Sequence, residues 1–212
     1  KWEGNDNPLL INDPRFSPAG VLAPKSKADL AFTMHMLSWL STSGTAAIVE
    51  FPGVLYRGGA EQKIRKYLVE NNYIDTVIQL PPDLFFGTTI ATCIIVLKKS
   101  KKDNSILFID ASAEFVHLGN KNKLAEANRK KILDAFIRRK GTDYFARLVP
   151  NSEVAANDYN IAVSSYVEQE NTTEEVNIEE LNAHIAEIVT RQNKLRAAID
   201  EIVANLEGIA CH

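Results

Sequence analysis

Two loops contain the residues whose types and spacing could do chemistry. The first loop, 52–59, ends in Arg57, Gly58 and Gly59, directly before a predicted helix. An arginine beside the free N–H groups at the start of a helix suits a phosphate. The alternative is that the glycine pair only forms the turn that caps the helix.

The second loop, 81–89, combines a proline pair, adjacent aromatic residues and a hydroxyl group. Its candidate site residues are Pro81, Pro82, Phe85, Phe86 and Thr88. Neighbouring aromatic side chains suit a nucleobase or another flat ligand, because every base has a face that can stack. The alternative is that the phenylalanines belong to the core. We predict that both loops bind a ligand, the first through a phosphate and the second through a flat group.

The elements that would position these loops alternate between strand and helix. Residues 45–51 and 74–80 have the composition of strands, and residues 60–71 have the apolar spacing of an amphipathic helix. Strand, helix and strand at this spacing predict a parallel pair with a right-handed crossover. Ligands of open α/β sheets bind at the carboxyl ends of such strands, so both loops are expected on one rim.

The remaining pattern completes an α/β fold. We predict a buried helix at 30–40, strands at 91–98 and 105–110, and a basic amphipathic helix at 122–140, before an irregular stretch to about 167. The connection between the last two strands is too short for a parallel crossover, which makes them antiparallel neighbours. The expected sheet is mainly parallel, with antiparallel strands towards one edge.

The chain divides into a domain and a tail. Residues 1–167 form the predicted domain, beginning with an irregular proline-containing segment at 1–28, and residues 168–177 form a polar linker. The tail is a predicted coiled-coil or bundle helix at 178–207, whose apolar positions follow alternating steps of three and four. These assembly positions are Ile178, Leu181, Ile185, Ile188, Gln192, Leu195, Ile199, Ile202 and Leu206.

The single polar member of this stripe, Gln192, falls at an a position of the heptad, where polar residues fix register or partner choice. We expect the stripe to dock on a partner. The alternative is that the helix folds back on its own domain.

Charge and composition narrow the class of protein. The net charge is −3, but residues 168–207 carry ten acidic and three basic side chains, whereas residues 121–140 carry eight basic and two acidic ones. A basic body permits a nucleic-acid partner. The alternative is that these charges belong to solvated helix faces and a solvated hairpin end. Two separated cysteines favour a reducing cytoplasm, the four histidines lack metal spacing, and no apolar run is long enough for a membrane span.

Several blocks of sequence resemble one protein family. The runs Gly53–Lys101, Ile106–Ser112 and Asn157–Val167 look like the modification subunit of type I restriction–modification systems, and Pro14–Leu40 is similar to the segment after that family's catalytic motif. The resemblance covers about residues 12–167. It implies a Rossmann-like, S-adenosylmethionine-dependent methyltransferase that modifies adenine N6 in DNA.

The resemblance also implies which partners the protein has and which family motifs lie outside residues 1–212. The partners are DNA, a specificity subunit that the tail would meet, and a restriction subunit. The cofactor loop and the Asn-Pro-Pro-Phe motif are expected before Lys1, so the chain alone is expected to be inactive. The target adenine is flipped from the duplex in such chemistry. The resemblance therefore implies that both loops line a rim that meets this base and the DNA around it. Pro81-Pro82 does not replace the motif, since Leu80 and Asp83 flank it.

Two stretches depart from the family pattern, and other functions stay open. Glu50-Phe51 stands where an aliphatic pair is expected, and Ala162–Ser165 differs from the usual run. The alternatives are a methyltransferase that acts on RNA or protein, and a non-enzymatic module for assembly or DNA binding. The residues upstream of Lys1 in the natural gene would distinguish them.

Overall fold

The computed structural model describes residues 2–4, 7–169 and 178–209. It separates into two units, Lys1–Glu170 and Asn171–His212. From residue 170 onwards, the expected linker 168–177 lies outside the described residues.

The first unit is built on a five-stranded mixed sheet in the order β1-β3-β2-β4-β7. Its strands are β1 (Thr45–Glu50), β2 (Ile74–Gln79), β3 (Cys93–Lys98), β4 (Ser105–Asp110) and β7 (Ala146–Pro150). A separate hairpin consists of β5 (Val116–Leu118) and β6 (Lys121–Lys123).

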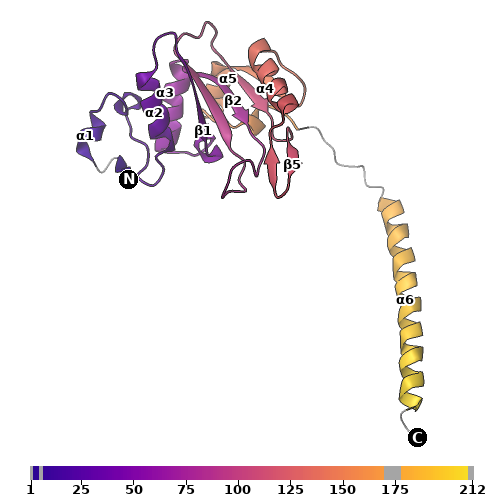
Figure 1. Cartoon of the computed structure of the whole chain (residues 1–212). Coiled ribbons are helices and arrows are strands. Elements are labelled where there is room, and N and C mark those ends of the chain that lie inside the picture. Colours follow the sequence, from indigo (N-terminus) through magenta and orange to yellow (C-terminus); the bar gives the residue numbers. More distant parts are fainter. Residues whose placement is uncertain (1, 5–6, 170–177, 210–212) are drawn as a thin grey trace. The chain divides into compact units, whose positions relative to one another are not determined.

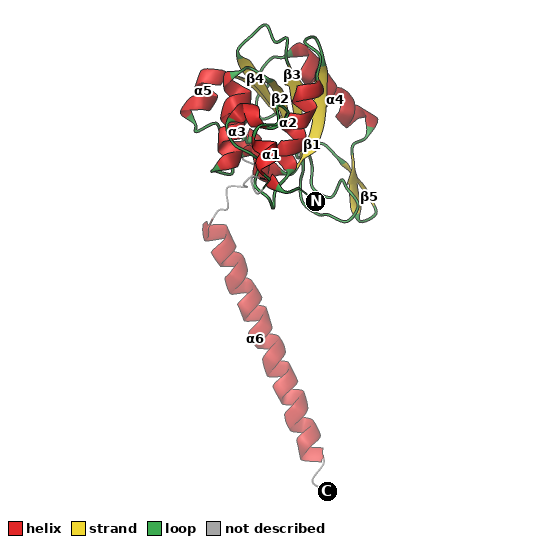
Figure 2. Cartoon of the chain, turned by 90° about the vertical axis from the view of Figure 1, so that its left-hand side faces the viewer, coloured by secondary structure: helices red, strands yellow, loops and turns green. Residues whose placement is uncertain are grey.

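Helices cover both faces of this sheet (Figures 1 and 2). The α-helices are α1 (Pro8–Ile11), α2 (Asp29–Trp39), α3 (Ala60–Glu70), α4 (Glu126–Arg138) and α5 (Asn151–Ala156), with 3₁₀ turns η2 (Ser17–Ala19), η3 (Pro52–Leu55) and η4 (Val163–Ser165). The layers of α2, α3 and α5 share one core cluster, whereas α4 packs on the opposite face. This arrangement confirms the predicted α/β fold class.

Alternation along the central strands explains the two clusters. In β4, Ile106 and Phe108 face the α3 side, while Leu107 and Ile109 face α4, and all four are fully buried. Successive side chains of a strand point to opposite faces of a sheet. Each such burial stabilises the fold by about 1.5–3 kcal/mol, which makes β4 a main anchor of both layers.

The expected strand pairing is wrong in two places. β3 lies between β1 and β2 and is antiparallel to both, so the predicted direct pairing of 45–51 with 74–80 does not occur. β4 pairs in parallel with β2 instead of lying beside β3. β2 with β4 is the single parallel pair among the described strands, so the sheet is less parallel than expected. The reason is that β3 is apolar on both faces, which favours a central position.

The sequence reading also missed short elements. Residues 121–123 belong to the β5–β6 hairpin, and α4 begins at Glu126 instead of 122. The stretch read as irregular contains β7, α5 and η4. The hairpin had a signal, because Gly119-Asn120 is a two-residue turn typical of hairpins. β7 had none, since its burial does not alternate.

The second unit contains the helix α6 (Ile178–Ile209). All the predicted stripe positions from Ile178 to Ile202 have exposed side chains, and that of Leu206 lies outside the described ones. Within this unit, the described residues include no second element that could cover the stripe.

Candidate nucleic-acid interface

The two predicted loops leave the same edge of the sheet. Glu50 of β1 and Gln79 of β2 both pair with Cys93 of β3, and Gln79 also pairs with Asp110 of β4. β1 and β2 run in the same direction, since both are antiparallel to β3. The expectation of a shared rim is therefore confirmed, even though β3 separates the two strands.

The first loop folds its arginine back on itself. The guanidinium of Arg57 lies across Gly53, where an added Cβ would be only 2.3 Å from it. It also sits 5.2 Å from the centre of the Phe51 ring and 3.5 Å from a carboxylate oxygen of the buried Glu61. About a quarter of the Arg57 side chain remains exposed. Gly59 has a φ of 71°, which glycine adopts at little cost, at the N-cap of α3.

A buried arginine that the sequence reading missed supports this loop. Arg65 is 1% exposed and donates to the carbonyl oxygens of Val54 at 2.9 Å and Tyr159 at 2.8 Å. Burial lowers the pKa of its guanidinium to about 10. The backbone N–H of Ile161 also donates to the carbonyl of Leu55 at 2.9 Å. Segment 157–161 is thus tied to the rim, and the signal was a charged residue at an inward helix position.

The β5–β6 hairpin holds the second loop. The ammonium group of Lys121 donates to the carbonyl of Thr88 at 2.9 Å and lies 3.4 Å from the carboxylate of Asp83. The side-chain amide of Asn122 donates to the carbonyl of Pro82 at 2.9 Å, and its backbone N–H donates to Asp83. These contacts fix both ends of the loop.

Between these fixed ends the loop presents its aromatic residues to solvent. Phe86 is fully exposed and Phe85 is 42% exposed, so neither residue is a core phenylalanine. Pro81 is buried at the base of the loop, while Pro82 and Thr88 are half-buried. A large apolar ring held out from a fastened loop is a suitable stacking surface.

The buried carboxyl of Glu50 lies at the end of β1, below the first loop. Thr33 donates its hydroxyl proton to a carboxylate oxygen at 2.8 Å. Burial raises the pKa of Glu50 to about 7, and Asp29 adds to the effect, while the Thr33 hydrogen bond opposes it. The thiol of the neighbouring Cys93 has its pKa raised to about 12 by burial, so it is no candidate nucleophile.

This carboxyl predicts a pH-dependent stability. The pKa of Glu50 is 4.5 in its ordinary state and about 7 in the fold, so its stabilising contribution is full below pH 4.5 and lost as pH rises to 7. Glu50→Gln keeps an oxygen that accepts from Thr33 but cannot titrate. We expect the wild type to lose about 2 kcal/mol relative to the variant between pH 5 and pH 8. Urea unfolding of both proteins at both pH values measures this. An equal change in the free energy of unfolding of the wild type and the variant would contradict the prediction.

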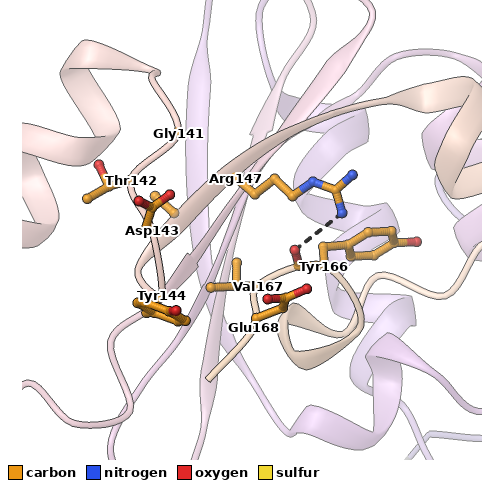
Figure 3. A pocket seen from close by; sticks show the side chains of 9 residues that line it. Gly141, Thr142, Asp143, Tyr144, Arg147, Tyr166, Val167 and Glu168 are labelled. Atoms are coloured by element: carbon orange, nitrogen blue, oxygen red, sulfur yellow. Dashed lines mark hydrogen bonds between the residues drawn. The ribbon is translucent and has the colours of Figure 1, made fainter. Parts of the chain in front are cut away.

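A cavity of about 460 Å³ lies where β7 begins (Figure 3). Its charged side chains are Asp143, Arg147 and Glu168, and Arg147 donates to the carbonyl of Tyr166 at 3.4 Å. Two carboxylates and one guanidinium, which is also paired with Glu153, define no single ligand class. Sequence reasoning did not find this cavity, because β7 was not predicted.

The described residues offer neither a metal-binding cluster nor a membrane-spanning helix. Among the described residues, no group of three or more histidine, cysteine or acidic side chains could hold a metal ion. Within the same residues, no helix is long and apolar enough to cross a membrane.

The fold and rim together define an α/β domain that offers an exposed aromatic loop at the carboxyl end of a strand, which suits a nucleobase or another flat ligand. The chain belongs to the N-6 DNA Methylase family, whose model matches residues 1–175. This result confirms the family resemblance seen in the sequence.

Named relatives show how much of the family's length is present. The chain is 48% identical over 207 residues to the type I restriction enzyme MpnII methylase subunit of Mycoplasma pneumoniae, covering 97% of this chain and 38% of that protein. It is 35% identical over 196 residues to the MjaVII methylase subunit of Methanocaldococcus jannaschii, covering 90% and 33% respectively. The chain thus spans about a third of these relatives.

A solved structure also supports the fold. The type I restriction-modification system methyltransferase subunit of Streptococcus thermophilus superimposes with a TM-score of 0.76 at 46% identity. The match covers 79% of this chain and 36% of that one.

Proposed function

We propose that this chain is part of the DNA methyltransferase subunit of a type I restriction–modification system, which transfers a methyl group from S-adenosylmethionine to adenine N6. One observation carries the proposal beyond family membership. Phe86 is fully exposed on a loop that Lys121 and Asn122 fasten at the sheet's rim. An enzyme that flips a base from the duplex needs such an aromatic surface.

We assign roles to the rim residues on this basis. Phe86 stacks on the flipped adenine, with Phe85 and Thr88 beside it and the proline pair as the base of the loop. The exposed edge of Arg57 and the N–H groups that follow Gly58 and Gly59 face a backbone phosphate. The ion pair of Arg57 with Glu61 limits this contact, which makes Phe86 the stronger assignment.

The described residues do not fit S-adenosylmethionine by themselves. The cavity beside β7 combines two carboxylates with an arginine that is already paired, and neither rim loop has the glycine-rich turn expected before Lys1. We therefore assign no cofactor contact to these residues. Family membership supports use of this cofactor by the intact subunit.

The tail gives the proposal its partners. The exposed stripe of α6 docks on the specificity subunit, and the assembly includes a restriction subunit. Burying one isoleucine or leucine contributes about 1.5–3 kcal/mol, so a stripe of this length can hold a stable complex. The same proposal places the protein in the cytoplasm, where it would meet its DNA.

The experiment that tests the activity is methyl transfer to duplex DNA. The intact subunit and its specificity subunit are incubated with S-adenosylmethionine, and the modified nucleoside is identified. N6-methyladenine is expected. Methylated RNA or protein without methylated DNA would contradict the proposal.

A further inference from the structure

A groove beside α4 carries an excess of positive charge. It lies between α4 and the turn 140–145 and has a volume of about 570 Å³. Ala135 and the buried Phe145 contribute apolar surface to it. Its charged side chains are Lys130, Lys131, Arg138 and Lys140, against one carboxylate, Asp134.

Most of these cations are available to a ligand. Lys131 pairs with Glu114 and lies 4.4 Å from the centre of the Phe145 ring. Lys130, Arg138 and Lys140 are exposed, and within the described part of the chain none of them forms an ion pair. Long, exposed and unpaired cations gain little from the protein itself, so an anionic partner binds them at small cost.

The Phe145 end of the groove lies at the edge of the sheet from which the loop of Phe86 leaves. The backbone N–H of Asp110, at the end of β4, donates to the carbonyl of Phe145 at 2.8 Å. Glu114, four residues later, is the partner of Lys131. The same connection continues into the β5–β6 hairpin, which holds the loop of Phe86. A continuous series of contacts therefore links the groove to the proposed base-facing loop.

We propose that this groove binds the sugar–phosphate backbone of duplex DNA beside the target base. The inference rests on the proposed function, because the position of the target base defines which DNA reaches the groove. A helix of 13 residues is about 20 Å long, and one strand carries a phosphate about every 3.4 Å, so several phosphates fall along α4. An acidic protein segment has the same sign of charge as DNA. DNA is the favoured partner, because the proposed function already brings DNA to this edge of the sheet.

The test measures how DNA binding depends on salt. The 212-residue chain is titrated with a fluorescent duplex by anisotropy, as wild type and as the groove variant Lys130→Ala/Arg138→Ala/Lys140→Ala. At 0.1 M salt we expect the variant to bind at least roughly tenfold more weakly for every sequence tested. The slope of log K against log salt should fall by about 2–3, since each lost phosphate contact removes about 0.9.

Matched variants separate charge from structure. Lys63→Ala/Lys66→Ala/Lys102→Ala removes three exposed cations elsewhere on the domain and should bind DNA like the wild type. Lys130→Arg/Arg138→Lys/Lys140→Arg keeps the charges and should restore both affinity and slope. Unchanged DNA binding in the groove variant would overturn the inference. Polyglutamate, titrated in the same way, represents an acidic protein segment. A groove variant that loses polyglutamate binding but keeps DNA binding would also overturn the inference.

Failure of this inference differs from failure of the proposed function. If the groove variant binds DNA and supports methyl transfer like the wild type, the inference about the groove is wrong and the proposed function stands. If the intact subunit binds DNA through the groove in a salt-dependent way but methylates no DNA, the proposed function is wrong and the inference about the groove stands.

Discussion

Replacing Phe86 by alanine in the intact subunit should lower the rate of methyl transfer by roughly 10–100-fold, since stacking of a base on an aromatic ring contributes about 1–3 kcal/mol. Duplex binding should change much less, because binding to DNA depends mainly on phosphate contacts. Stability should not change, because Phe86 is fully exposed and its loop is fixed by other residues. Single-turnover methylation, anisotropy and thermal unfolding measure the three quantities.

Two control variants make this result specific. Phe86→Trp keeps a stacking surface and should retain most of the rate. Ile90→Ala removes a half-exposed apolar side chain directly after the loop and should have little effect on methyl transfer. Equal loss of rate in the Phe86 and Ile90 variants would show that the loop tolerates no change, and it would refute a stacking role for Phe86.

Deleting Asn171–His212 should abolish assembly with the specificity subunit while the α/β unit stays folded. The core clusters of the first unit contain no residue from the deleted segment. The thermal unfolding midpoint of the remaining unit should therefore change by no more than a few degrees. Size-exclusion chromatography with the specificity subunit reports on assembly, and an unimpaired complex would refute the docking role of the tail.

Paired substitutions locate the docking surface on α6. Ile188→Glu/Leu195→Glu places two charges in the stripe and should disrupt the complex, because a buried unpaired charge costs several kcal/mol. Thr190→Glu/Ala197→Glu adds the same charge on the opposite side of the helix and should leave assembly intact. Equal disruption by both variants would mean that the helix itself, and not its stripe, was damaged.

Local sequence patterns predicted where helices and strands lie along the chain. They predicted less well which strands lie side by side in the sheet. The helix 60–71 and the strands 74–80 and 91–98 were found from apolar spacing, and they correspond to α3, β2 and β3. Position in the sheet depends on which strand buries both faces, and a window of one strand does not show this. β3 therefore lies between β1 and β2, although the common direction of β1 and β2 was predicted correctly.

The sequence predicted the exposed residues of the candidate site, but it did not predict the buried residues that support them. Phe86 lies at the rim in an accessible position, as the loop pattern indicated. The support from Arg65 was not foreseen, because its acceptors are the carbonyls of Val54 and Tyr159, which are distant in sequence. The groove beside α4 was foreseen only as a basic helix, since its wall at 140–145 depends on the pairing of β7 with β4.

The most direct test of the account is to identify the methylated base while Phe86 is varied. The intact subunit with its specificity subunit is given duplex DNA and isotopically labelled S-adenosylmethionine, and the nucleosides are separated by mass. We expect labelled N6-methyladenine in DNA, formed roughly 10–100-fold more slowly by Phe86→Ala than by the wild type or Phe86→Trp. Label found only in RNA or protein, or an unchanged rate in Phe86→Ala, would contradict it.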